Sequence, residues 1–124
     1  MARIADYVVI TNSTHELQKD GLRPVKEDFQ FTLESGAHVN SRAVLAFVLK
    51  VESDANDLHL EVEINGSDQV GYTFSGFRSS ATLHEVLSRD VLKADGENEI
   101  KFELDGGEGG VKFGNVVLFY QRDI

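Results

Sequence analysis

The chain has 124 residues, of which 41% are hydrophobic, so it can build one core of ordinary size but hardly two. Acidic residues outnumber lysine and arginine by 21 to 12, the formal net charge is −9, and there is no cysteine. This acidity argues against nucleic acid and anionic membranes as partners, because both are bound through basic side chains. The missing thiols exclude disulfides, cysteine nucleophiles and cysteine-based zinc sites. We therefore expect one domain, over residues 1–124.

The acidic charge gathers in the middle of the chain. Residues 1–51 contain six basic and six acidic side chains, whereas residues 52–108 contain four and fourteen. The apolar stretch near the N-terminus is short and includes Asp6, which fits neither a signal peptide nor a membrane span. A cytoplasmic location is the resulting expectation.

The N-terminal part of the chain predicts two strands and a long connection. Residues 7–11 have the composition of a short opening strand, and the polar stretch 12–26, which holds the only proline, reads as a connection. Apolar and polar residues then alternate over residues 28–33, which directs Phe29, Phe31 and Leu33 to one buried face.

The middle of the chain predicts an interior strand followed by a hairpin. Residues 42–51 are apolar without a break from Ala43 to Leu49, as expected for a strand covered on both sides or lying at the centre of a sheet. Residues 58–64 alternate strictly, and the Asn65-Gly66 pair that follows favours a tight turn. The chain should return as a second strand through residues 69–74.

The segment from Ser80 to Lys93 allows two interpretations. Thr82 and Glu85 have the spacing of a helical capping box, so a helix of about three turns is one alternative. We favour a strand over residues 81–87 and a helical turn over residues 88–93, because a turn and a further strand follow directly.

The C-terminal part predicts a turn over residues 95–98 and an alternating strand over residues 99–104. The glycine-rich stretch 105–110 lacks the following helix that a phosphate-binding loop needs, so it reads as a flexible hairpin connection. The last strand, residues 111–121, contains Gly114-Asn115, which predicts a β-bulge.

Taken together, these elements predict an all-β fold, an antiparallel jelly-roll-type β-sandwich of about eight strands with at most one short helical turn. Three passages of the chain, residues 60–66, 91–102 and 111–120, resemble the galactose-binding-domain-like β-sandwiches. These jelly-roll modules occur among carbohydrate-binding domains and as accessory domains of glycosidases, and small uncharacterised proteins share the arrangement. The resemblance implies a carbohydrate-binding-module-like fold. It transfers no binding residue, because sugar-binding members use exposed aromatic rings, often tryptophan, whereas this chain has no tryptophan and directs most of its eight phenylalanines inward.

Two groups of residues are candidates for a binding site. Tyr72, Phe77, Arg78 and His84 place amphipathic and cationic groups around a loop, where sites concentrate, although packing and charge balance would also explain them. His59 shares a strand face with Glu61 and Glu63, which could begin a metal site or an acid/base pair but is also typical of a solvated face.

Calcium is the one ion that the sequence leaves open, for two reasons. The stretch 52–57 is rich in oxygen ligands, and many modules of the resembling group carry structural calcium. The stretch lacks the glycine and final glutamate of a calcium loop, so a solvated turn is the preferred interpretation. We expect no other cofactor.

The sequence favours a small non-catalytic binding module with a carbohydrate or protein ligand. The alternative is a structural subunit that self-associates through exposed strand edges into a homo-oligomer. A hydrolase using carboxylates such as Glu61 and Glu63 is the third and least favoured hypothesis, because the chain has no recognisable catalytic constellation.

Overall fold

A computed structural model describes residues 2–19 and 24–124 of the chain and contains seven antiparallel strands. Neither helix nor helical turn occurs in these residues, and none of their segments could cross a bilayer as a helix. The strands are β1 (Arg3–Lys19), β2 (Lys26–Phe31), β3 (Val44–Val51), β4 (Asn56–Ile64), β5 (Ser67–Phe74), β6 (Arg78–Val86) and β7 (Asn98–Asp123).

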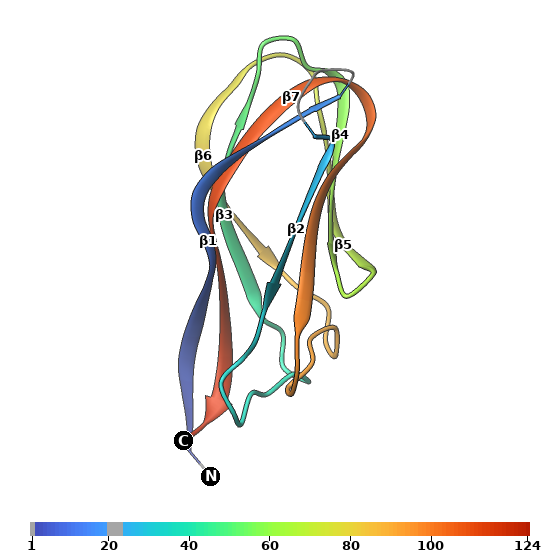
Figure 1. Cartoon of the computed structure of the whole chain (residues 1–124). Coiled ribbons are helices and arrows are strands. Elements are labelled where there is room, and N and C mark those ends of the chain that lie inside the picture. Colours follow the sequence, from blue (N-terminus) through green and yellow to red (C-terminus); the bar gives the residue numbers. More distant parts are fainter. Residues whose placement is uncertain (1, 20–23) are drawn as a thin grey trace.

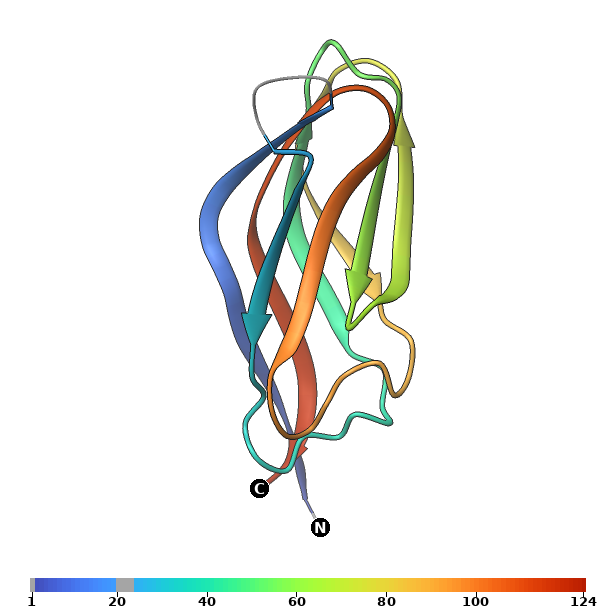
Figure 2. The same cartoon turned by 45° about the vertical axis from the view of Figure 1, so that its right-hand side comes forward.

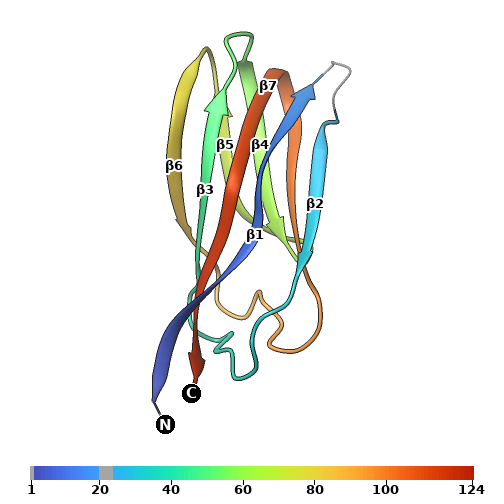
Figure 3. The ribbon, with the colours of Figure 1, turned by 60° about the vertical axis from the view of Figure 1, so that its left-hand side comes forward.

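The strands form two layers that share β7 (Figures 1 and 2). One layer has the order β1-β7-β3-β6 and the other the order β2-β7-β4-β5. Figure 3 shows β6, β3, β7 and β1 side by side, with the other layer behind them. Because β7 serves both layers, seven strands fill eight positions, and the predicted jelly-roll β-sandwich is confirmed.

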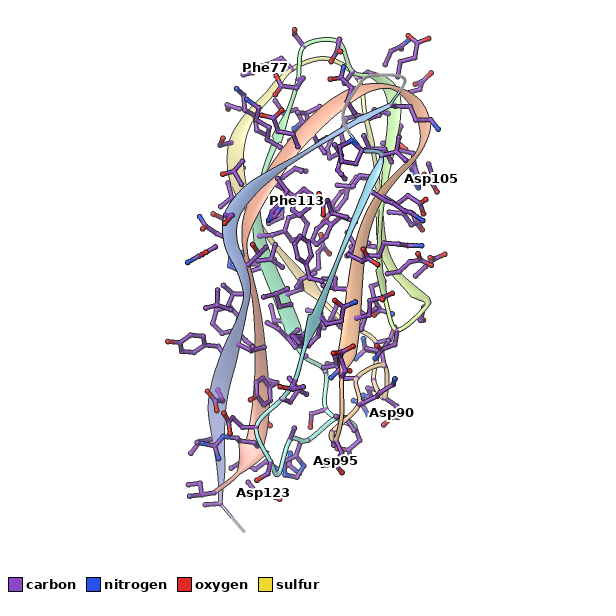
Figure 4. All side chains as sticks on the ribbon, viewed as in Figure 1. Phe77, Asp90, Asp95, Asp105, Phe113 and Asp123 are labelled. Carbon is purple, nitrogen blue, oxygen red and sulfur yellow. The ribbon has the colours of Figure 1, made fainter. Side chains whose placement is uncertain are left out.

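The core lies between the layers, where the predicted inward faces meet. The apolar side of β4, with Leu58, Leu60 and Val62, is fully buried. Phe102 and Phe113, from the two halves of β7, stack across the core with ring centroids 4.2 Å apart. Figure 4 shows Phe113 pointing into this space. The hydrophobic effect on these two facing surfaces holds the sandwich together.

The opening strand is longer than predicted, and the prediction of a connection over residues 12–26 is wrong over its first part. β1 continues to Lys19 and pairs with β7, with register shifts between Val9 and Thr14. Leu17 is 1% exposed and anchors this polar segment in the core. The irregular register breaks the alternation that marks a strand in the sequence. Residues 20–23 of the predicted connection lie outside the described residues.

The glycine-rich stretch 105–110 is a continuous part of β7, not the flexible loop that its composition predicts. The strand turns over from one layer to the other here, as the orange-to-red ribbon of Figure 1 shows. A Cβ on Gly107 would lie 2.1 Å from the carbonyl oxygen of Asp57, and a Cβ on Gly109 would lie 2.5 Å from Ala55 Cα. The glycines are therefore required by a close backbone approach.

The predicted bulge at Gly114-Asn115 is confirmed. The pairing of β3 with β7 shifts between Ala46 and Val48, opposite this pair of residues. Asn115 has a φ of 49°, and a Cβ on Gly114 would lie 2.6 Å from the carbonyl oxygen of Ser13. The extra residue of the bulge changes the phase of the alternation, so Phe113 before it and Val116 after it both face the core.

The segment after β6 contains neither the helical turn predicted over residues 88–93 nor the alternative helix. Its backbone amides donate to distant groups instead: Leu87 to the carbonyl of Ala43, and Asp90 to the carbonyl of Val39. Because these amides are already bonded, the capping-box spacing of Thr82 and Glu85 initiates no helix. Both residues lie within strand β6.

Two asparagines join the ends of the inner strands. Asn98, the one fully buried polar residue among those described, accepts hydrogen bonds from the amide of Lys93 (2.8 Å) and from Nδ2 of Asn65 (2.9 Å). Its own Nδ2 donates to the carbonyl of Lys93. Asn65 occupies the confirmed turn after β4 with a φ of 52°, and its Oδ1 accepts from the amide of Glu99.

Candidate functional site

A cleft of about 230 Å³ opens where the free edges of β5 and β6 face each other. The backbone links the two sheets here through the connection that follows β5, and no strand of the described chain closes the gap between their edges. Its lining combines an apolar floor with a polar rim and consists of Leu49, Val51, Tyr72, Phe74, Arg78, Ser79, Ala81 and Leu83.

Tyr72 is half-buried and bridges the two sheets at this edge. Its ring stacks on Phe74 with centroids 5.6 Å apart and meets the edge of Phe47 in the core. Its hydroxyl donates a hydrogen bond to Glu85 of β6. Burial, and then the bond to the charged Glu85, raise the pKa of Tyr72, so the hydroxyl stays protonated. The ring is thereby fixed in place beside the cleft.

Arg78 provides the positive charge of the cleft. It opens β6 opposite Val51 and is exposed, and its guanidinium lies 5.8 Å from the centroid of the Phe74 ring. Arg78 has no part in the ion pairs of residues 2–19 and 24–124. Its hydrogen-bond donors are therefore available to a ligand, while the aromatic ring orients the side chain.

Of the four predicted site residues, the structure brings Tyr72 and Arg78 together and places the other two elsewhere. Phe77 is 58% exposed in the connection between β5 and β6, beneath the ammonium group of Lys50, which is 5.8 Å from its ring centroid. Figure 4 shows it at the upper end of the molecule. His84 lies opposite Ala46 and points to the outer side of its sheet, away from the cleft.

Sequence reasoning missed the floor of the cleft. Phe74 and Leu83 occupy inward positions of β5 and β6, where alternation assigns them simply to the core. Which inward residues line a cleft depends on how the two sheet edges separate. That separation leaves no local signal in the sequence.

A second polar group lies on the outer side of the β2-β7-β4-β5 sheet. His59 Nε2 is 2.8 Å from Glu61 Oε2 and 3.7 Å from Oδ1 of Asp105. Asp105, labelled in Figure 4, joins the group from β7, which the predicted loop over residues 105–110 concealed. These three side chains could ligate a metal ion, since one donor atom of each lies within 4.8 Å of the others.

Glu63, the other residue of the predicted face, does not join this group. The Lys101 ammonium, 2.6 Å away, donates to Glu63 and holds the pKa of its carboxyl below the usual value. A general acid needs a raised pKa. Glu63 is therefore suited to an ion pair and not to the role of a general acid.

The residues considered for calcium have other partners. Within the stretch 52–57, Glu52 lies 3.8 Å from the ammonium of Lys112, which is also 3.5 Å from Glu16. Asp54 accepts a hydrogen bond from Gln18. Lys112 thus supplies positive charge between Glu52 and Glu16, and the solvated turn, preferred to calcium from the sequence, stays a prediction.

No protein-family model matches the chain, and no curated protein matches it. Among solved structures, dimeric latent PorU from Porphyromonas gingivalis is similar over 99% of this chain, with a TM-score of 0.68 and 9% identity. BuGH86 in complex with neoagarooctaose is similar over 97%, with a TM-score of 0.57 and 13% identity. The chain spans only 13% and 19% of the length of these two proteins.

Structures of its own size are similar as well. The xylan-binding module CBM15 matches 96% of this chain over 97% of its own length, with a TM-score of 0.52 and 13% identity. A family 35 carbohydrate-binding module from Clostridium thermocellum matches 91% over 97%, with a TM-score of 0.50 and 11% identity. At these identities the likeness concerns the fold. The chain has the jelly-roll β-sandwich fold of carbohydrate-binding modules, as its resemblance predicted.

Proposed function

We propose that the protein is a non-catalytic carbohydrate-binding module that holds its ligand in the cleft between β5 and β6. The observation that carries the proposal is that one opening combines aromatic side chains with Arg78, which forms no ion pair among the described residues. Tyr72 and Phe74 present stacked rings, and Arg78 lies over one of them. The fold shared with two carbohydrate-binding modules supports this choice over other ligands.

The chemistry of the cleft suits a sugar. A pyranose ring has apolar C–H faces, which pack on aromatic and aliphatic side chains, and a rim of hydroxyl groups that need hydrogen-bond partners. In the cleft, Phe74 and Leu83 offer the apolar surface, while Arg78 and Ser79 offer donors at the rim. The cleft lining contains no carboxylate, so it lacks the pair of acidic groups that glycoside hydrolysis requires.

The proposal is tested by binding to soluble polysaccharides, with xylan and agarose as first probes and a glycan array as a wider screen. Arg78→Ala should weaken binding by about 10- to 100-fold, the equivalent of a charge-assisted hydrogen bond. Arg89→Ala is the matched control, because Arg89 is also exposed but lies in the turn after β6. Phe77→Ala should leave the affinity unchanged, since Phe77 does not line the cleft.

Two results would contradict the proposal. One is the absence of binding to every glycan, and the other is binding that Arg78→Ala and Tyr72→Phe leave intact. Calcium and a chelator should give the same affinity, because the cleft has no carboxylate ligands for the ion. If the chelator abolished binding, the ligand would bind elsewhere on the molecule and not in the cleft.

A further inference from the structure

The outer side of the β1-β7-β3-β6 sheet carries a surface of apolar side chains from all four strands. Strand register places Tyr7, Phe119, Val44 and Val86 in one row across the sheet. The next row continues with Val9, Val117 and Ala46, and its apolar character ends at His84 of β6. We call this surface the apolar face; it consists of Tyr7, Val9, Val44, Ala46, Val48, Val86, Val117 and Phe119.

Much of the apolar face is in contact with solvent. Tyr7 is 61% exposed, Val86 58%, Val9 50% and Phe119 45%. Single exposed apolar residues are ordinary on protein surfaces, but here Tyr7, Val9 and Phe119 lie on the paired strands β1 and β7, and the partly exposed Val44 of β3 connects them to Val86 of β6. Contiguous patches of this kind mark surfaces that bind another molecule.

The sequence of β3 points the same way. Its apolar run from Ala43 to Leu49 is typical of a strand inside a sheet, which β3 is between β6 and β7, or of a strand covered on both sides. The core covers one side through Leu45, Phe47 and Leu49, whereas on the other side Val44 and Val48 stay partly exposed and the small Ala46 is buried. The opposite sheet behaves differently, because the outer positions of β4 are polar. The pattern therefore predicts a cover over the first sheet only.

Charge indicates what this cover is. The chain has a net charge of −9, and a second copy would be repelled wherever carboxylates meet. Glu61, Glu63, Glu103 and Asp105 lie on the outer side of the opposite sheet, which makes that side unsuitable for self-association. None of the side chains of the apolar face is an acid or a base that is charged at neutral pH. It is thus a surface on which two acidic copies can meet without repulsion.

The shape of the apolar face is self-complementary. Both of its aromatic residues, Tyr7 and Phe119, lie in the half formed by β1 and β7, whereas the half formed by β3 and β6 contributes only the smaller residues Val44, Ala46, Val48 and Val86. A two-fold axis parallel to the strands would place the aromatic half of one copy on the aliphatic half of the other. Large side chains then pack on small ones, as sheet-on-sheet packing at about 10 Å requires.

We propose that two copies of the chain pack through the apolar face, sheet on sheet, as a two-fold symmetric dimer. This inference is independent of the proposed ligand. The cleft opens at the edge between β5 and β6, whereas the apolar face lies on the outer side of the sheet, so the dimer leaves both clefts open. A dimer of this form would present two binding sites to a polymeric ligand and gain affinity through bivalence.

Sedimentation equilibrium over a range of protein concentrations tests the dimer. The wild-type chain should sediment with twice the mass of one chain. Phe119→Glu and Val86→Glu should each weaken dimerisation by at least ~100-fold, because symmetry buries two unpaired carboxylates per dimer. Val25→Glu is the matched control and should remain dimeric, since Val25 is an exposed valine that immediately precedes β2 of the opposite sheet. Circular dichroism checks that each variant is folded.

A measurement on the unchanged protein keeps the test valid should a variant fail to fold. Hydroxyl-radical footprinting should show Tyr7 and Phe119 protected at high protein concentration and reactive on dilution, while Phe77 stays reactive throughout. A monomer at every concentration would overturn the proposal. So would a dimer that persists in Phe119→Glu and Val86→Glu, or an assembly that leaves Tyr7 reactive, because association would then use the strand edges.

Discussion

Gly107 offers the sharpest test of the arch that β7 forms between the layers. In Gly107→Ala, the φ of 77° would cost about 1–2 kcal/mol, because an L-residue is strained in the left-handed region. The new Cβ would also lie 2.1 Å from the Asp57 carbonyl oxygen and 2.4 Å from its carbon. Both are backbone atoms, so the arch itself must move, which adds about 1–3 kcal/mol of overpacking strain. The total loss of unfolding free energy should be about 2–5 kcal/mol.

Gly66→Ala provides the matched control. Gly66 has nearly the same φ, 80°, but a Cβ there would meet nothing within 4 Å. Gly66→Ala should therefore lower the unfolding free energy only by the cost of the positive φ, about 1–2 kcal/mol. The difference between the two variants therefore isolates the contact between the arch and Asp57.

The assay is urea unfolding followed by circular dichroism at one fixed protein concentration, so that any association contributes equally. Gly107→Ala should lower the transition midpoint clearly more than Gly66→Ala, with the slope m unchanged. Equal midpoints would refute the reasoning, because they are the result expected of the flexible loop that composition predicts. If Gly107→Ala does not fold, Gly110→Ala is a milder version, since its Cβ would lie 3.0 Å from the Leu17 carbonyl oxygen.

Three further predictions concern polar side chains and are measured by urea unfolding, by thermal melting or by urea unfolding at a series of pH values. Asn98→Ala should cost about 2–4 kcal/mol, because it removes a fully buried hub of hydrogen bonds, whereas exposed Asn40→Ala should change stability by less than about 0.5 kcal/mol. Partial desolvation and nearby carboxylates raise the pKa of Asp68 above its usual value of 3.8. The folded state is therefore most stable with respect to this group below pH 3.8, where Asp68 is protonated, and it loses that stability as the pH rises through the raised pKa. Asp68→Asn should therefore raise the melting temperature at pH 7 and leave it unchanged near pH 3. The pKa of Glu63 is lowered by Lys101, so that pair stabilises above pH 4.5 and is lost on acidification, and Lys101→Met should flatten the acid limb of the stability curve.

Much of the fold was predictable because alternation is a local signal. The buried face of β4, the turn at Asn65 and the bulge at Gly114 follow from side-chain periodicity and from residues that tolerate positive φ. The arch of β7 was not, because glycine marks a flexible loop and a close backbone contact equally well. Only the position of Asp57, fifty residues away, distinguishes the two at Gly107.

The site was partly predictable for a related reason. Tyr72 and Arg78 flank one short connection, so sequence proximity already groups them. The separation of His84 from this group depends on one unit of strand register, which sends it to the outer side of β6 while Leu83 and Glu85 face inward. Asp105 reaches His59 from another strand, and no sequence interval encodes that contact.

The residues that carry the family resemblance explain why it indicates the fold and not the ligand. Asn65 and Asn98, from two of the three resembling passages, hydrogen bond to each other and to the backbone at 91, 93 and 99. They fix the ends of β4 and β7 at the opposite end of β5 from the Phe74 side of the cleft, so their role is to lock the topology. Neither asparagine lines the cleft. A chain can therefore keep these residues while its cleft changes, and any specificity for a sugar must be sought in Tyr72, Arg78 and their neighbours.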